Sequence, residues 1–134
     1  MYNKIYGNYG ENLAKKFLKK AGYKVLITNY TKRSGEADII ALEKRSARRK
    51  REEYKSMPKD VQKEDVVVFI EVKARTNKEF GTPSDAVNKV KQQKYLSIAR
   101  SFFMLNPRFQ GMNYRFDIIE VVEDQVTNHY INAF

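Results

Sequence analysis

The stretch VVVFIEVKARTNKEFG, residues 66–81, decides the fold expected for this chain. It opens with an unbroken apolar run, which is typical of a buried strand, and Glu71 and Lys73 then follow one residue apart. Side chains of a strand alternate between its two faces, so Glu71 and Lys73 share a face with Phe69, and Val72 lies on the other. The sequence therefore predicts a buried strand that carries a carboxylate and an ammonium group on one face.

A second predicted strand, over residues 36–43, supplies acidic side chains of the same kind. Its Glu36 and Asp38 share one face. Neighbouring strands lie about 4.8 Å apart, so Asp38 lies close to Glu71 if the two strands pair. Two nearby carboxylates repel each other unless a cation lies between them, and Mg²⁺ prefers oxygen ligands and commonly uses one or two carboxylates. The two strands therefore predict a magnesium site with Lys73 beside it.

Such a site has the parts that phosphodiester hydrolysis needs. A divalent ion polarises a phosphate oxygen and lowers the pKa of a bound water, and a lysine can orient that water or stabilise the charge that develops. A Glu–Lys pair on one strand face is also common as a solvated surface pair, and E-x-K alone is a weak motif. The acidic pair on the second strand favours the metal site over this simpler interpretation.

Composition narrows the chemistry and the partners. The chain has 134 residues, enough for a single domain over 1–134, and its net charge is +10. An excess of this size attracts polyanions, nucleic acid above all, with an anionic membrane surface as the rival. No apolar run approaches the ~20 residues of a membrane span, and no hydrophobic leader is present, so we expect a cytoplasmic protein. The absence of cysteine excludes disulfides, thiol catalysis and cysteine-based zinc sites.

The remaining patterns predict an α/β or α+β fold with a mixed central sheet flanked by helices. The element order is helix, three strands, helix, two strands. Glu11 lies at the edge of the buried face of the first helix. The predicted elements around the two acidic strands are a helix ending at Gly22, a strand over 24–28, a helix from a cap at Thr82 to about Leu105, and a hairpin of 113–122 and 126–131.

Between the two acidic strands lies a charge-rich insertion, residues 44–65, which is poor in apolar residues. We expect it to protrude from the core. Its Arg48, Arg49 and Arg51 can contact phosphates or can simply belong to a solvated loop, and the sequence leaves both interpretations open.

Eight sequence blocks cover the chain nearly end to end: GNYGENLAKKFL, GYKVLITNY, GEADIIAL, VFIEVKART, FGTPSDAV, KQQKYLSIARSF, YRFDIIEV and HYINAF. Together they resemble the bacterial YraN-like proteins, a branch of the restriction-endonuclease-like, PD-(D/E)xK superfamily. Asp38, Glu71 and Lys73 match the D…(E/D)-x-K core of that superfamily. Archaeal Holliday-junction resolvases are a more distant likeness.

The resemblance implies a restriction-endonuclease-like core and a set of site residues. Asp38 and Glu71 would hold Mg²⁺ or Mn²⁺, the Val72 carbonyl would be a further ligand, and Lys73 would attend the attacking water. Glu11 matches the first-helix acid of the superfamily and would act through a metal-bound water.

Further residues are assigned supporting roles. Glu36 is the second acid of its strand, and Gln92 or Gln93 resembles a glutamine that archaeal Holliday-junction resolvase-like relatives carry after the lysine. The spacing does not choose between the two glutamines. Lys91 and Lys94 interrupt the buried side of a helix, so they either contact phosphates or extend their ammonium groups to solvent.

Three strand residues and the single histidine complete the expectations. Arg75 either holds a phosphate or only flanks its strand. Arg115 and Asp117 share a strand face and are expected to form a local ion pair, and His129 is expected to be structural.

The function expected on these grounds is a metal-dependent DNA endonuclease acting on branched or damaged DNA in repair or recombination. The alternative is a non-catalytic nucleic-acid-binding or scaffolding protein that keeps the nuclease fold. We expect DNA as the partner and no membrane association, and a homodimer stays open because nucleases that cut both strands commonly dimerise.

Overall fold

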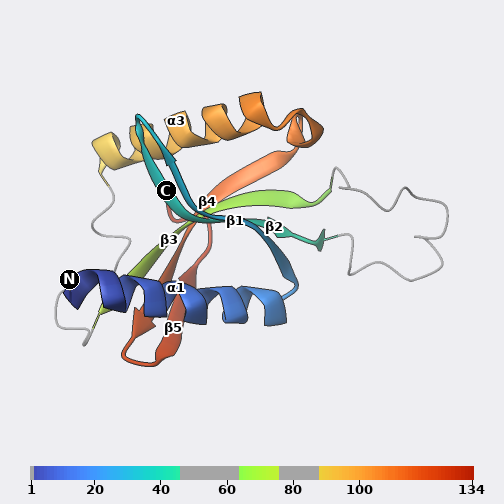
Figure 1. The fold of residues 1–134 in the computed structure, drawn as a ribbon. Helices are drawn as coiled ribbons and strands as arrows, with labels where there is room; N and C mark the ends of the chain where they lie inside the picture. The colour runs from blue at the N-terminus through green and yellow to red at the C-terminus, as the bar shows by residue number, and fades with distance from the viewer. Residues whose placement is uncertain (1, 46–63, 76–87) are drawn as a thin grey trace, which may run out of the picture.

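The computed structural model describes residues 2–45, 64–75 and 88–134 of the chain (Figure 1). The predicted order of helix, three strands, helix and two strands is confirmed. The elements are α1 (Tyr2–Lys20), β1 (Tyr23–Lys32), β2 (Gly35–Glu43), β3 (Val66–Arg75), α3 (Lys89–Leu105), a short 3-10 helix η3 (Pro107–Phe109), β4 (Asn113–Val122) and β5 (Gln125–Tyr130).

The strands form one five-stranded mixed sheet in the order β1-β2-β3-β4-β5. The pairs β1–β2, β2–β3 and β4–β5 are antiparallel, whereas β3 and β4 run parallel. A parallel pair needs a crossover connection, and α3 lies in the chain between β3 and β4. The mixed sheet flanked by helices is therefore confirmed, with α3 on one face and α1 on the other (Figure 1).

Each face of the sheet carries its own apolar core, as the alternation of β3 predicts. Phe69 packs in the core beneath α3, while Val68 and Ile70 pack in the core beneath α1. The same alternation places Glu71 and Lys73 on the α3 face of β3. Large buried side chains complete the two layers: Ile40, Leu42, Ile98 and Phe102 on the α3 side, and Leu18, Ile39 and Ile119 on the α1 side.

The start of α3 differs from the prediction. The helix begins at Lys89, because Asn88 is extended, with φ −107° and ψ 176°, and its side chain accepts a hydrogen bond of 2.9 Å from the Lys91 N–H. A continuous helix from Thr82 is therefore wrong, and the predicted cap at Thr82 lies outside the described residues. The predicted end at Leu105 is confirmed.

The first strand is longer than the predicted span of 24–28. β1 continues to Lys32, and its polar end pairs with β2 through Thr31 opposite Glu36 and Lys32 opposite Gly35. Backbone hydrogen bonds hold this part of the hairpin, so side-chain polarity did not reveal it. The insertion between β2 and β3 leaves the sheet beside an ion pair of 3.2 Å between Lys44 and Asp65, and residues 46–63 lie outside the described part of the chain.

Helix α1 approaches the sheet most closely at Gly10. A Cβ atom at this position would lie 2.9 Å from the Cβ of Ala74 and 3.7 Å from a methyl group of Val72 on β3. Only glycine fits this approach without displacing the helix or the strand.

We expect Gly10→Val to lower the free energy of unfolding by about 1–3 kcal/mol, because the new side chain overpacks the contact with Ala74. Asn12→Val places the same side chain at an exposed position of the same helix and is expected to change it by less than about 0.5 kcal/mol. Urea unfolding followed by circular dichroism measures both. Equal stability of the two variants would contradict the close approach.

Candidate metal site

A cavity of about 530 Å³ opens between β2, β3 and the first turns of α3. Its walls carry both signs of charge: Glu36 and Asp38 come from β2, Glu71 comes from β3, and Lys91 and Lys94 come from α3. The two acidic strands therefore lie side by side as predicted, and α3 forms the third wall of the cavity.

Asp38 lies beside Glu71 because of the antiparallel register of their strands. Ile39 pairs with Ile70, and continuing that register brings Asp38 opposite Glu71. Here a side chain replaces a backbone carbonyl as the acceptor: Oδ2 of Asp38 accepts a hydrogen bond of 2.8 Å from the Val72 N–H. This bond holds the Asp38 carboxylate at the edge of β3.

The surroundings of Asp38 disfavour its negative charge. Burial raises the pKa of its carboxyl group to about 6, the Val72 N–H opposes this shift, and the charges of Glu11 and Glu71 raise the pKa further. Glu36 acts in the same direction. Several carboxylates therefore share one poorly solvated region, and a cation among them would lower its electrostatic energy.

Glu71 is held by two lysines through only one of its oxygens. Oε1 lies 3.1 Å from Nζ of Lys73 and 2.5 Å from Nζ of Lys91. The other oxygen, Oε2, is buried, since Glu71 as a whole is only 9% exposed, and it has no hydrogen-bond partner within the described part of the chain. A buried carboxylate oxygen without a partner is costly, and a bound cation would satisfy it.

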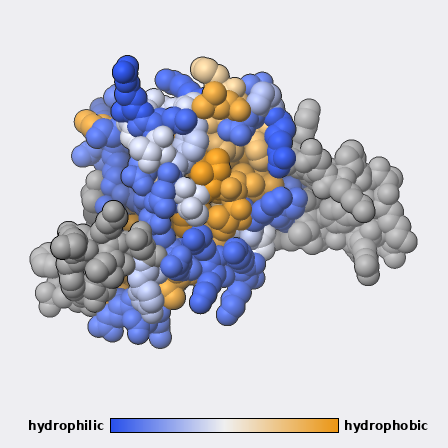
Figure 2. Space-filling view, in the orientation of Figure 1, coloured by the Kyte–Doolittle hydropathy of each residue, from blue (hydrophilic) through white to orange (hydrophobic). Residues whose placement is uncertain are grey.

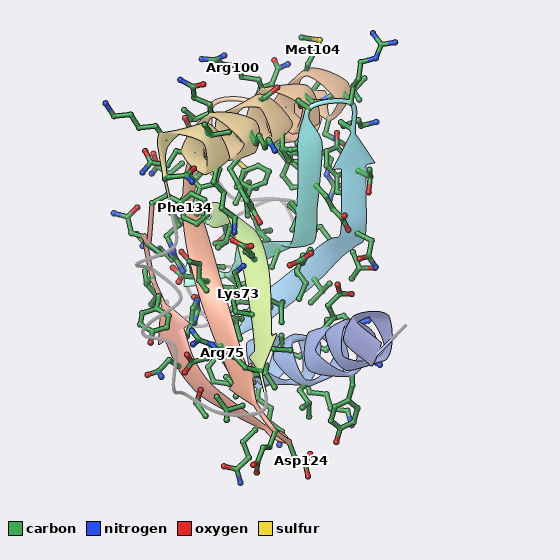
Figure 3. All side chains as sticks on the ribbon, turned by 90° about the vertical axis from the view of Figure 1, so that its left-hand side faces the viewer. Lys73, Arg75, Arg100, Met104, Asp124 and Phe134 are labelled. Atoms are coloured by element: carbon green, nitrogen blue, oxygen red, sulfur yellow. The ribbon has the colours of Figure 1, made fainter. Side chains whose placement is uncertain are left out.

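Lys73 remains an ammonium group in this setting. Burial acts to lower the pKa of Lys73, but the charge and the hydrogen bond of Glu71 outweigh it, so the pKa lies above its usual value. The Asp38 charge acts in the same direction as Glu71. Figure 3 shows Lys73 on β3, at a height between α3 and α1.

The acid on the first helix joins the carboxylate group, as predicted. Burial raises the pKa of Glu11, a hydrogen bond with Asn29 opposes the rise, and the charge of Glu36 adds to it. Glu11 also contributes to the raised pKa of Asp38. Helix α1 thus brings a fourth carboxylate within electrostatic reach of the site.

The residues present fit a divalent ion with few protein ligands. Among the described residues, no group of three or more His, Cys, Asp or Glu side chains is arranged to hold a metal ion. Mg²⁺ usually keeps several waters and needs only one or two carboxylates, which Asp38 and Glu71 can supply. The N–H and C=O groups of a strand residue point to the same edge, so the Val72 carbonyl faces Asp38 as its N–H does.

The two glutamines do not reach the cavity. Gln92 and Gln93 are exposed and do not line it, whereas Lys91, Lys94 and Tyr95 do. Successive helix residues are turned by about 100°, so a helix that directs Lys91 and Tyr95 inward directs the glutamines elsewhere. The supporting role predicted for Gln92 or Gln93 has no contact in the structure that favours it.

The predicted phosphate-binding residues separate into different environments. Arg75 lies 3.3 Å from Glu120 in an ion pair, which favours the structural alternative for this residue. Lys91 pairs with Glu71, whereas Lys94 is exposed at the cavity. Arg48, Arg49 and Arg51 lie outside the described residues.

Tyr95 is a cavity residue to which the sequence patterns above assign no role. It is 5% exposed and packs its ring against Phe116 and Phe134. Burial raises the pKa of its hydroxyl group, and the charge of Glu71 raises it further. The signal was its spacing of four residues from Lys91, which places both on one face of the helix.

A separate charged cluster lies on the α1 side of the sheet. Arg115 contacts Asp117 at 3.0 Å and Glu43 at 3.0 Å, and His129 contacts Asp117 at 2.7 Å. Tyr23 donates a hydrogen bond of 2.8 Å to Glu43. The predicted ion pair of Arg115 with Asp117 is confirmed, and His129 serves to cross-link β5 to β4.

The raised pKa of Asp38 predicts how stability changes with pH. An acid with a raised folded-state pKa binds more protons when folded, so stability falls as pH rises from about 3.8 towards about 6. We therefore expect Asp38→Asn, in the presence of a chelator, to exceed the wild type in unfolding free energy by about 1–3 kcal/mol at neutral pH, and by little in acid.

Urea unfolding across this pH range measures the difference. Asp124→Asn, in the exposed turn after β4, is the matched control and should differ from the wild type by a constant amount. A difference for Asp38→Asn that does not change with pH would contradict the crowding of carboxylates around this residue.

No helix among the described residues is long and apolar enough to cross a membrane. The comparisons with known proteins identify the chain's relatives. The model of the uncharacterised protein family UPF0102 matches residues 10–121, a range that contains Glu11, Asp38, Glu71 and Lys73.

Individual relatives are similar over nearly the full chain. A UPF0102 protein of Caldanaerobacter subterraneus is 38% identical over 98% of this chain and 95% of its own length. A UPF0102 protein of Clostridioides difficile is 34% identical over 100% of both chains. Another, from Chloroherpeton thalassium, is 33% identical over 97% of this chain and 84% of its own length. The chain therefore belongs to the uncharacterised protein family UPF0102.

Proposed function

We propose that this chain is a divalent-metal-dependent phosphodiesterase that acts on DNA. The observation that carries the proposal is the pair of opposed carboxylates, Asp38 and Glu71, in a cavity where Glu71 Oε2 has no hydrogen-bond partner within the described residues. The net charge of +10 supplies the attraction for a polyanionic substrate.

Asp38 and Glu71 are the residues that would hold Mg²⁺ or Mn²⁺, and the Val72 carbonyl is a further oxygen on the same edge of β3. When bound, such an ion would polarise a phosphate oxygen and lower the pKa of a water molecule. The hydrogen bond from the Val72 N–H orients Asp38 before any ion binds. Glu11 would act through a water near Asp38, and its charge is one of those that raise the pKa of Asp38.

Lys73 would act as a positive charge rather than as a base. Because its pKa lies above the ordinary value, it carries its proton at neutral pH and cannot accept another from water. An ammonium group beside Glu71 can stabilise the negative charge that develops on a phosphate under attack. It also orients Glu71 by holding Oε1.

The resemblance to the restriction-endonuclease-like superfamily supports the same activity, since Asp38, Glu71 and Lys73 match its core residues. The names of the relatives state no activity. We extend the proposal to branched or damaged DNA, in repair or recombination, on the distant likeness to Holliday-junction resolvases alone. Action in the cytoplasm and a homodimer belong to the same proposal.

One observation favours a second function, a nucleic-acid-binding protein without catalysis. Lys73 and Lys91 both contact Oε1 of Glu71, so part of the carboxylate charge is already balanced by the protein itself. In that function the carboxylates form ion pairs that hold α3 against β3.

Cleavage of labelled linear, nicked, flapped and four-way DNA in Mn²⁺ or Mg²⁺ tests catalysis. We expect Glu71→Gln and Lys73→Met to lose about 100-fold or more in rate, because the first weakens the hold on the metal ion and the second removes the positive charge beside the reacting phosphate. Glu123→Gln and Lys19→Met make the same chemical changes at exposed positions and should keep the wild-type rate.

Two results would contradict the proposal. Cleavage that survives both Glu71→Gln and Lys73→Met would come from another site or from a contaminating nuclease. Metal-independent binding of DNA, with no cleavage of any substrate by the wild type, would favour the non-catalytic function.

A further inference from the structure

The tip of the β1–β2 hairpin lies against α3. Oγ of Ser97 donates a hydrogen bond of 2.9 Å to Oγ of Ser34, and the hydroxyl oxygens of Tyr30 and Ser101 lie 3.4 Å apart. Gly35 has φ +155°, and a Cβ there would lie 3.5 Å from the Cβ of Lys94. The tip and the helix therefore form one continuous surface, which Figure 1 shows beside the first half of α3.

Positive charges gather on this surface, which is mostly hydrophilic in Figure 2. Lys32 and Arg33 are exposed at the tip, and Lys94 is exposed on the neighbouring turn of α3. Nζ of Lys32 lies 5.1 Å from the centre of the Tyr30 ring, a cation–π distance that restricts the ammonium group to this region. We name Lys32, Arg33 and Lys94 the hairpin–α3 surface.

These cations have no ion-pair partner in the described part of the chain. No Asp or Glu within it forms an ion pair with Lys32, Arg33 or Lys94. Two less exposed arginines differ, since Arg75 pairs with Glu120 and Arg115 pairs with two acids. The cations of the hairpin–α3 surface are thus available to an anion from outside.

The surface adjoins the carboxylate cavity. Gly35, Glu36 and Lys94 all line that cavity, and Gly35 directly follows the tip. A phosphate approaching Asp38 and Glu71 meets repulsion from carboxylates, so a polyanion can rest there only if cations beside the cavity hold its neighbouring phosphates. The position of the hairpin–α3 surface meets that requirement.

We propose that the hairpin–α3 surface is a phosphate-backbone contact that holds a nucleic-acid strand beside the cavity. This inference rests on the proposed function for DNA as the ligand and adds Lys32 and Arg33 to its binding residues. The guanidinium of Arg33 can bind a phosphate through two hydrogen bonds, whereas the lysines act as point charges. Contacts of this kind position the strand and carry no sequence preference.

The test measures binding of a fluorescein-labelled DNA duplex by anisotropy over a series of salt concentrations, with a chelator present. The variant is Lys32→Ala with Arg33→Ala, and the control is Lys19→Ala with Lys20→Ala, which removes the same charge from the last turn of α1. All four side chains are exposed, so the unfolding midpoints should match that of the wild type.

We expect the tip variant to lose about 10-fold or more in affinity at low salt. Its slope of log affinity against log salt should be shallower by about 1.8, the effect of losing two phosphate contacts. The control should lose less than half as much in both quantities, and adding Lys94→Ala to the tip variant should weaken binding further.

Equal losses of DNA affinity in the tip variant and the control would contradict the proposal, because they would show that DNA is attracted to the whole basic protein rather than to this surface. Unchanged binding by the tip variant would overturn it as well. Binding of the wild type to phosphatidylserine vesicles but not to DNA would replace nucleic acid with a membrane as the ligand. Because no metal is present, failure of the cleavage assay leaves these outcomes unaffected, so the two proposals fail separately.

Discussion

The hydrogen bond between the Asp38 carboxylate and the Val72 N–H is the contact on which the candidate site depends. Beyond the pair Ile39–Ile70, a side chain rather than a backbone carbonyl satisfies the next N–H of β3. The bond fixes a carboxylate at the edge of a central strand, opposite Glu71, where burial makes its charge costly. A fold does not keep such a group at a cost of stability unless something offsets it, and a cation is the simplest candidate.

The two helices complete the site from opposite layers of the sheet. Close packing at Gly10 holds α1 against β3 beside Glu11, whose charge acts on Asp38, and the Asn88 side chain caps the first turn of α3, from which Lys91 pairs with Glu71. Two uncharged residues therefore support the arrangement of the carboxylates and ammonium groups. Changes at those positions should alter the site without touching any group that acts on a substrate.

Alternation along strands made much of this predictable from the sequence. The shared face of Glu71 and Lys73 and the approach of Asp38 to Glu71 both follow from a period of two and an antiparallel pair. The ion pair between Arg75 and Glu120 could not be predicted in this way, because it depends on the parallel register of β3 with β4 across α3. Local spacing contains no information about that register.

The errors on α3 have a related cause. Thr82 has the sequence features of a helix cap, yet the described helix begins at Lys89 and is capped by Asn88. The orientation of the helix then decides that Lys91 and Tyr95 face the cavity while Gln92 and Gln93 do not. Helical periodicity gives relative directions of side chains, but the direction that points inward is set by tertiary packing.

The most direct test of the account is the position of a metal ion. Crystals grown with Mn²⁺ and measured at its absorption edge should show one anomalous peak within coordination distance of a carboxylate oxygen of both Asp38 and Glu71, and the peak should vanish in Asp38→Asn. A structure in which Mn²⁺ occupies neither carboxylate, while Lys73 and Lys91 remain on Glu71, would contradict the metal site and favour the ion-pair function.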